Sequence, residues 1–230
     1  MVATLRALFR ALLYVVLATL AIIVLLRWLP PPTSAFMLSA RVEALLSGDF
    51  SYRNRYDWVP ISAISPNAAV AVIAAEDQLF PSHAGFDFQS IRSALRHNAA
   101  GGRVRGGSTI SQQTAKNLFL WSGRSYLRKG LEACLTVTIE LLWPKERILE
   151  IYLNVAQFGA DTYGVQAASR QFFGKDARRL STREAATLAA VLPNPVRFKA
   201  DRPSPYLERR INRIEQQMRT IGGRQVLEQL

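Results

Sequence analysis

An apolar segment near the N-terminus, residues 11–26, constrains the fold of this chain more than any other feature. Only Tyr14 and Thr19 interrupt it, and an arginine flanks each end. With the apolar residues at 7–9 and 28–29 it reaches the roughly 20 residues that a bilayer-spanning helix needs, because the flanking arginines can extend toward the interfaces. We therefore expect a single N-terminal transmembrane helix.

A cleaved signal peptide is the alternative for this segment. A triple proline at 30–32 and a weak small-residue cleavage pattern favour a retained anchor instead. Because Arg6, Arg10 and the amino terminus outweigh Arg27, the positive-inside rule places the N-terminus in the cytoplasm and the following domain outside. The net charge of +12 points to polyanionic partners. An exported domain is poorly placed to bind nucleic acid, which leaves a membrane surface or a phosphorylated substrate.

The rest of the chain is typical of one helical domain. A length of 230 residues with 49% hydrophobic residues allows an anchor and proline-rich connector at 1–35 and a single domain at 36–230. Residues 36–46 are partly apolar and expected close to the membrane, and 101–107 form a glycine-rich basic loop. Strand signals are sparse, and helices are predicted at 67–80, 87–98, 108–118, 126–142, 145–154, 165–172, 182–191 and 205–220.

Two adjacent carboxylates, Glu76 and Asp77, end a helix that is apolar on every side. Burial would raise the pKa of Glu76 and suit it to act as a general base near neutral pH. The alternative, that one of the two simply pairs with a neighbouring arginine, is equally open from this segment. Asp77 is expected to be a structural hydrogen-bonding partner. A lone histidine in a Gly/Pro-containing loop, His83, is more typical of a satisfied polar residue than of a catalyst.

Two further segments combine polar and charged residues. At 106–113, Ser108 or Thr109 can cap a helix whose start would bind an anion, although an ordinary capped helix is the alternative. At 128–132, Glu132 shares the buried face of a helix, with Arg128 and Lys129 beside it. These cations suggest an anionic ligand.

For the charged residues at 140–150, the single cysteine and any bound metal, the sequence favours simpler interpretations. The charges at 140–150 are typical of a solvated face, with Lys145 or Glu150 as alternative supports of the site. Cys134 is expected in the core. No Cys/His spacing indicates zinc, so any metal would be magnesium or manganese with oxygen ligands, and no organic cofactor is indicated.

These motifs resemble those of the peptidoglycan glycosyltransferase family, the glycan-polymerising module of penicillin-binding proteins, in its monofunctional form. The resemblance covers residues 59–219 and rests on five ordered blocks: Glu-Asp-x-x-Phe-x-x-His-x-Gly at 76–85, Gly-Gly-Ser-Thr-Ile-Ser-Gln-Gln at 106–113, Arg-Lys-x-x-Glu at 128–132, Lys-Glu-Arg-Ile-Leu-Glu-Ile-Tyr-Leu-Asn at 145–154, and the segment 164–175. It implies a mainly α, lysozyme-like domain with two lobes, the smaller one embedded in the bacterial inner membrane.

The resemblance also implies a reaction and roles for residues. The family polymerises lipid II into uncrosslinked β-1,4 glycan with inversion, releasing undecaprenyl diphosphate. Glu76 resembles the base, and Glu132 the second glutamate, which assists the diphosphate directly or through a divalent ion. The matched positions for phosphate and cleft contacts are Lys116, Arg128, Lys129, Ser108, Gln112, Gln113 and Asn117; the supporting positions are Asp77, Phe80, His83, Gly85, Lys145 and Glu150.

The implied partners are lipid II, the nascent glycan chain, the bilayer and other proteins of wall synthesis or cell division. The chain has neither Ser-x-x-Lys nor Lys-Thr-Gly, so no transpeptidase module is expected. Two alternatives remain: a lysozyme-like enzyme that cleaves glycan, and a membrane scaffold with a degenerate domain.

Overall fold

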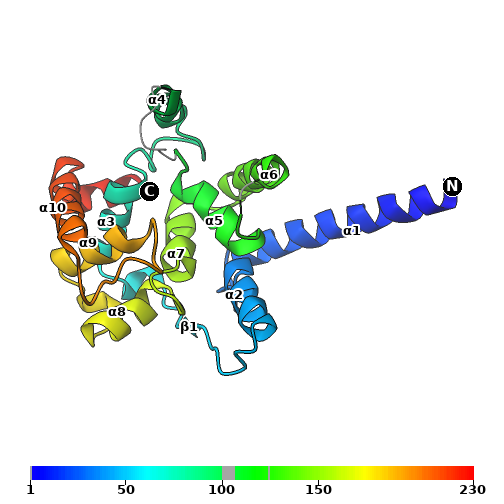
Figure 1. Cartoon of the computed structure of the whole chain (residues 1–230). Coiled ribbons are helices and arrows are strands. Elements are labelled where there is room, and N and C mark those ends of the chain that lie inside the picture. Colours follow the sequence, from blue (N-terminus) through cyan, green and yellow to red (C-terminus); the bar gives the residue numbers. More distant parts are fainter. Residues whose placement is uncertain (1, 100–106, 124) are drawn as a thin grey trace.

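The computed structural model describes residues 2–99, 107–123 and 125–230 and is mainly helical (Figure 1). The glycine-rich loop predicted at 101–107 lies outside the described residues, except for Gly107. Helix α1 (Val2–Leu26) projects away from the remaining helices, which form two groups on either side of α7 (Lys145–Val155). In the described part of the chain, regular strands are confined to a short parallel pair, β1 (Arg55–Tyr56) and β2 (Thr162–Tyr163).

Helix α1 fits the predicted anchor. Its segment Thr4–Leu26 has 23 residues, is almost entirely exposed, and is the single helix among the described residues that is long and apolar enough to cross a membrane. Its last turn packs on the domain, where Ile23 is fully buried and its carbonyl accepts a hydrogen bond of 2.8 Å from Trp143 Nε1. The chain therefore has a single-pass membrane anchor whose end is fixed to the domain.

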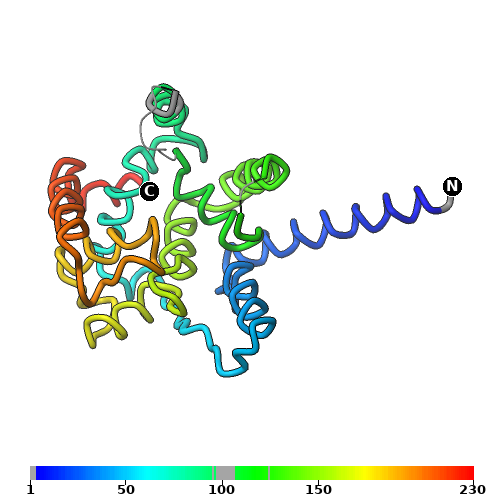
Figure 2. Tube along the Cα trace, in the orientation of Figure 1, coloured from blue at the N-terminus to red at the C-terminus, as the bar shows by residue number. Residues whose placement is uncertain are grey.

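The first group of helices surrounds α3 (Pro66–Glu76). Helices α9 (Thr182–Val191) and α10 (Pro205–Thr220) and the 3-10 helix η3 (Gly223–Gln229) pack against one another and around α3. Figure 2 shows the C-terminal segment turning back toward α3. Ser65 caps α3, and Pro66 occupies its first position. The predicted end at residue 80 was wrong, because Asp77 leaves the helical conformation at φ −162° and ψ 79°.

The second group contains the helices next to the anchor. Helix α5 (Ile110–Phe119) packs against α6 (Tyr126–Leu142), α7 and α2 (Ala35–Leu46). The central helix α7 is buried from Ile148 to Val155.

Helix α8 (Val165–Phe173) covers the strand pair, and α4 (Phe88–Ala99) stands apart at the top of Figure 1. Short 3-10 turns lie at Ile61–Ala63 (η1) and Ala177–Arg179 (η2).

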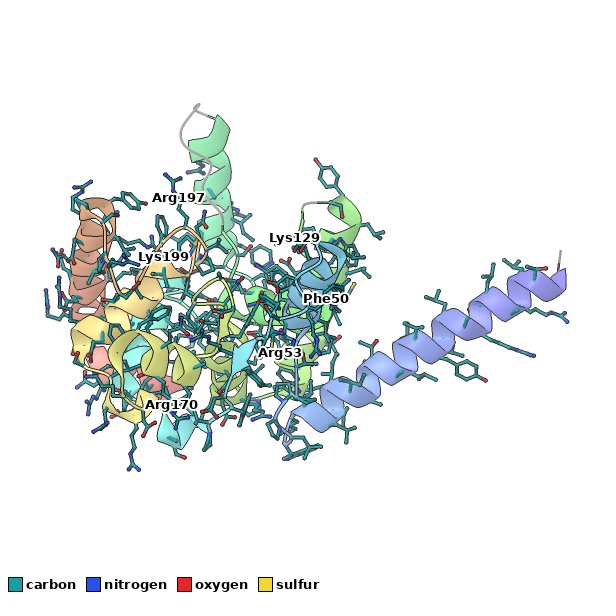
Figure 3. All side chains as sticks on the ribbon, turned by 60° about the horizontal axis from the view of Figure 1, so that its bottom comes forward. Phe50, Arg53, Lys129, Arg170, Arg197 and Lys199 are labelled. Carbon is teal, nitrogen blue, oxygen red and sulfur yellow. The ribbon has the colours of Figure 1, made fainter. Side chains whose placement is uncertain are left out.

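The outer faces of α2 and α6 are apolar and exposed. Figure 3 places Phe50, just after α2, and Lys129 on the side of the molecule from which α1 leaves, whereas Arg197 and Lys199 lie on the side of α9 and α10. Cys134 is also exposed, so its predicted core position was wrong. The reason is that α6 buries one face, through Arg128, Glu132, Thr136 and Ile139, and turns its other apolar side chains outward.

Candidate active site

Glu76 lies at the C-terminal end of α3 with 15% of its side chain exposed. Gln113 Nε2 donates a hydrogen bond of 2.9 Å to its Oε2, and Arg210 Nη2 lies 3.5 Å from its Oε1. Burial raises the pKa of Glu76 above its ordinary value, the direction expected from the sequence. Gln113, Arg210 and Lys116 oppose this shift because they favour the charged carboxylate.

The sequence analysis did not single out two residues that act on this carboxylate, one directly and one through Gln113. Arg210 comes from α10, where its Nε also donates to the Ala190 carbonyl at 3.2 Å. Tyr152, fully buried in α7, donates a hydrogen bond of 3.1 Å to Gln113 Oε1 and so turns the amide nitrogen of Gln113 toward Glu76. Arg210 lies outside the quoted motifs, and Tyr152 lies in the block at 145–154, but the contacts of both depend on the packing of distant helices.

Asp77 is a structural hydrogen-bonding partner, as expected. Its carboxylate accepts hydrogen bonds of 2.9 Å from His83 Nε2 and from the backbone N–H of Ile110, which ties the loop after α3 to the start of α5. The backbone N–H of Gly85 donates to His83 Nδ1 at 3.1 Å, so the histidine proton lies on Nε2. His83 is therefore a satisfied polar residue, and the fully buried Phe80 ring packs edge-on against it.

Glu132 is almost fully buried and contacts two cations. Arg128 Nη1 lies 2.7 Å from its Oε2, and Lys129 Nζ contacts its Oε1. Lys129 Nζ also approaches Ser108 Oγ at 3.4 Å, which joins α6 to the start of α5. The Nε of Arg128 is buried and has no acceptor in the described part of the chain. A buried donor without a partner is costly, so this nitrogen favours an anionic ligand.

Two neighbouring cavities contain the glutamates. Glu76 lines one of about 720 Å³, together with Asp77 and Asp87, and no cation lines it among the described residues. Glu132 lines another of about 450 Å³ with Lys116, Arg128 and Lys129. Ser108 lines both cavities, which places them next to each other. The groove thus has one acidic and one cationic compartment.

Helix α5 supplies most of the polar groups between these compartments. Lys116, Gln112 and Gln113 line the cationic cavity, whereas Asn117 is buried and lines neither. Thr109, rather than Ser108, caps the helix, and Gln112 Oε1 accepts from the Thr109 N–H at 3.0 Å in a capping box. Burial lowers the pKa of Lys116, and the nearby Glu132 carboxylate opposes this shift.

Among the charged residues at 140–150, Glu146 is exposed as predicted, but the others pair with one another and do not form a solvated face. Lys145 Nζ donates to the His83 carbonyl at 2.6 Å and pairs with Glu140 Oε1 at 2.8 Å, with 16% of the lysine side chain exposed. Glu150 accepts a hydrogen bond of 2.8 Å from the Ile61 N–H and pairs with Arg147. Lys145 thus supports the loop after α3, and Glu150 supports the segment before it.

Glu132 does not offer a ready site for a divalent ion. Both of its oxygens contact cations, and no group of three acidic, histidine or cysteine side chains gathers in the part of the chain that the structure describes. An ion would have to displace Lys129 and take its other oxygen ligands from a substrate. The binding of magnesium or manganese stays a prediction.

The fold and groove together define a membrane-anchored, mainly helical enzyme with two buried or half-buried glutamates and a cluster of cations at one of them. The family model described as Transglycosylase matches residues 43–219. The chain belongs to this transglycosylase family.

Curated relatives match along nearly the whole chain. Proteins named biosynthetic peptidoglycan transglycosylase are 53% identical in Pseudomonas entomophila, over 98% of this chain and 95% of the relative, and 51% identical in Pasteurella multocida, over 98% and 91%. One of the same name in Xanthomonas campestris pv. campestris is 55% identical over 86% of this chain and 80% of the relative.

Proposed function

We propose that this protein polymerises lipid II into uncrosslinked β-1,4 peptidoglycan glycan strands and releases undecaprenyl diphosphate. The observation that carries the proposal is the division of the groove, with Glu76 in an acidic cavity and the cations gathered around Glu132 in the next. Inverting transfer to a hydroxyl needs a base on one side of the sugar and stabilisation of the leaving group on the other. The names of the relatives support the same activity.

In this proposal Glu76 is the general base. Its carboxylate takes the proton from the 4-hydroxyl of the incoming lipid II while that oxygen attacks the anomeric carbon of the growing chain. The bond from that carbon to the diphosphate breaks, and the electron pair leaves with undecaprenyl diphosphate. A pKa raised by burial brings Glu76 closer to neutral pH, where a base is most effective. Gln113 fixes the orientation of the carboxylate.

The cationic cavity stabilises the leaving diphosphate. Arg128 and Lys129 are held by Glu132, and Lys116 lies beside them, so three positive charges face one small space. Charged hydrogen bonds to phosphate oxygens are short and strong, and the diphosphate therefore needs little help from an acid. Glu132 keeps Arg128 and Lys129 in place for this purpose.

The membrane supplies the lipid-linked substrate at the height of the groove. We propose that the N-terminus is cytoplasmic and the domain lies on the outer side of a bacterial inner membrane. Exposed apolar residues on the side of the anchor support contact with the bilayer: Leu45, Leu46, Phe50, Leu127, Leu131 and Leu141. The contacts of Ile23 with the domain support retention of the anchor rather than cleavage.

The test is incubation of the full chain in vesicles with purified lipid II. We expect glycan polymer and undecaprenyl diphosphate from the wild type, and a loss of turnover of about 10²-fold or more for Glu76→Gln with folding preserved. Glu146→Gln is the matched control, because Glu146 is exposed on α7. Absence of polymer would refute the proposal. Cleavage of preformed glycan would support a lysozyme-like enzyme, and a cellular role unaffected by Glu76→Gln would support a scaffold.

A further inference from the structure

We propose that Phe36, in the first turn of α2, is a positioning residue that holds the Lys116 ammonium in the cationic cavity. The inference rests on the proposed function, because it assigns Lys116 to the leaving diphosphate. Both residues line this cavity, and Lys116 Nζ lies over the Phe36 ring at 5.4 Å from its centroid. This distance is within the range of a cation–π interaction.

Lys116 differs from its two cationic neighbours. Arg128 and Lys129 each contact Glu132, whereas no carboxylate lies within ion-pairing distance of Lys116 in the described part of the chain. An aromatic face attracts an ammonium without neutralising its charge, unlike a carboxylate. The ring therefore restrains a flexible side chain while its charge and its N–H donors remain available to a diphosphate.

The Phe36 ring is itself held by a well-fixed backbone. Ser34 caps α2 by accepting a hydrogen bond of 3.2 Å from the Met37 N–H, and the Met37 side chain is buried. Asn54 Nδ2 donates to the Met37 carbonyl at 2.9 Å, and Tyr56 Oη donates to the Pro31 carbonyl at 2.6 Å. The connector between the membrane helix and the domain thus sets the position of one wall of the cavity.

The first experiment separates binding from turnover with lipid II in vesicles. For Phe36→Leu, which keeps an apolar side chain but removes the ring, we expect kcat to fall about tenfold with a KM within about twofold of wild type. Phe36→Tyr keeps the aromatic face and should restore most of kcat. Glu43→Gln, exposed on the same helix, is the control and should behave as wild type. If the wild type makes polymer and Phe36→Leu matches it in kcat, the inference is wrong.

The second experiment tests whether Phe36 acts through Lys116. Affinity for undecaprenyl diphosphate in vesicles is measured for the wild type, Phe36→Leu, Lys116→Met and the double variant, with circular dichroism to verify folding. The released diphosphate carries the charge that develops only as the bond breaks, so we expect Phe36→Leu to weaken its binding about tenfold in the wild type, and less than about twofold when Lys116 is already replaced. Equal weakening in both backgrounds, or no binding by the wild type, would overturn the inference. These outcomes differ from failure of the proposed function, which is the absence of polymer from the wild type.

Discussion

At the scale of single residues, Glu76 combines opposing influences on its charge. Burial disfavours the carboxylate, whereas the amide of Gln113 and the cations Arg210 and Lys116 favour it, and the net effect is a raised pKa. A raised pKa makes the carboxylate a stronger base than an exposed glutamate, as a proton acceptor requires. Small changes around Glu76 should therefore alter both stability and the pH dependence of activity.

Glu76→Gln should make the fold more stable at neutral pH. The pKa of Glu76 in the folded state lies above its ordinary value of 4.5, so the folded state binds this proton more tightly than the unfolded state does. The stability that this proton adds to the folded state is fully present below pH 4.5, and it is lost as the pH rises through the pKa of the folded state. We expect a melting temperature about 2–4 °C higher for the variant near neutral pH and none of this gain in acid. A melting temperature of Glu76→Gln below that of the wild type at neutral pH would contradict this prediction.

Arg210→Gln should move the acid side of the pH–rate profile to higher pH. Removing the guanidinium 3.5 Å from Glu76 Oε1 removes an influence that lowers the pKa of this carboxylate. We expect the acid limb of the kcat/KM profile to move to higher pH by about one unit or less. Arg213→Gln, exposed on the same helix, is the control. Superimposable profiles for the wild type and Arg210→Gln would show that Arg210 has no such role.

Several residues of the site were identifiable from local sequence because each belongs to a continuous motif. Glu132, for example, lies on the same face of its helix as the apolar residues. The contacts of Arg210, Tyr152 and Phe36 were not identifiable, because each reaches the groove from a helix far away in the sequence, although Tyr152 belongs to the motif at 145–154. Their positions depend on how α2, α7 and α10 pack, and hydrophobic periodicity does not specify packing between helices.

At the scale of elements, α7 holds the end of the membrane helix. Arg147 Nε donates to the Leu26 carbonyl at 3.0 Å, and its Nη2 donates to the Leu26 and Leu29 carbonyls at 2.8 and 2.6 Å. A cation at the C-terminal end of a helix also complements the helix dipole. Through its pair with Glu150, Arg147 connects α1 to the core of the domain.

Arg147→Ala should loosen the junction between α1 and the domain. Several charge-assisted hydrogen bonds are lost, each contributing about 1.5–3 kcal/mol. We expect the backbone amides of residues 27–29, 33 and 34 to exchange hydrogen at least about tenfold faster, measured by mass spectrometry in detergent. Glu146→Ala, on the exposed side of the same helix, should leave this exchange unchanged. An equal rate in Arg147→Ala would mean that other contacts fix the junction.

The loop after α3 depends on a close approach to α6 at Gly85. This residue has φ +87°, and a Cβ there would lie 2.8 Å from Thr136 Cγ2. We expect Gly85→Ala to lower the free energy of unfolding by about 2 kcal/mol. Gly130→Ala is the matched comparison, since Gly130 lies within α6 with open space around it, and it should raise that free energy by about 0.5–1 kcal/mol. Thermal unfolding in detergent measures both, and a neutral Gly85→Ala would refute the close approach.

The helices themselves were largely predictable, but their ends and surroundings were not. The eight helices predicted from 67 to 220 are present, because apolar periodicity and caps such as Ser65 are local signals. The exposure of Cys134 was misjudged, and Lys145 and Glu150 follow the alternative of a supporting role rather than that of a solvated face. An apolar side chain can face lipid as well as a protein core, and a charged side chain can be buried beside a partner of opposite charge. The residue type alone therefore does not tell whether a side chain is exposed or buried.

At the scale of the whole molecule, the proposed orientation predicts which side chains are accessible from outside the cell. In a Cys134→Ser background, we expect Gln216→Cys to react with a membrane-impermeant maleimide once the outer membrane is permeabilised. Thr4→Cys, which keeps the charges that set the orientation, should react only after the inner membrane is opened. Gln216 is exposed on α10, and Thr4 is exposed on α1. The reverse pattern of labelling would place the domain in the cytoplasm.

The fixed junction between α1 and the domain has a mechanical consequence. A transmembrane helix tilts to match the thickness of its bilayer. Because Arg147 and Trp143 hold the last turn of α1, the domain cannot keep its own angle when the helix tilts, and both must turn together. Bilayer thickness then sets the inclination of the groove toward the lipid surface and, in the proposed function, the distance over which a lipid-linked sugar must rise to reach Glu76.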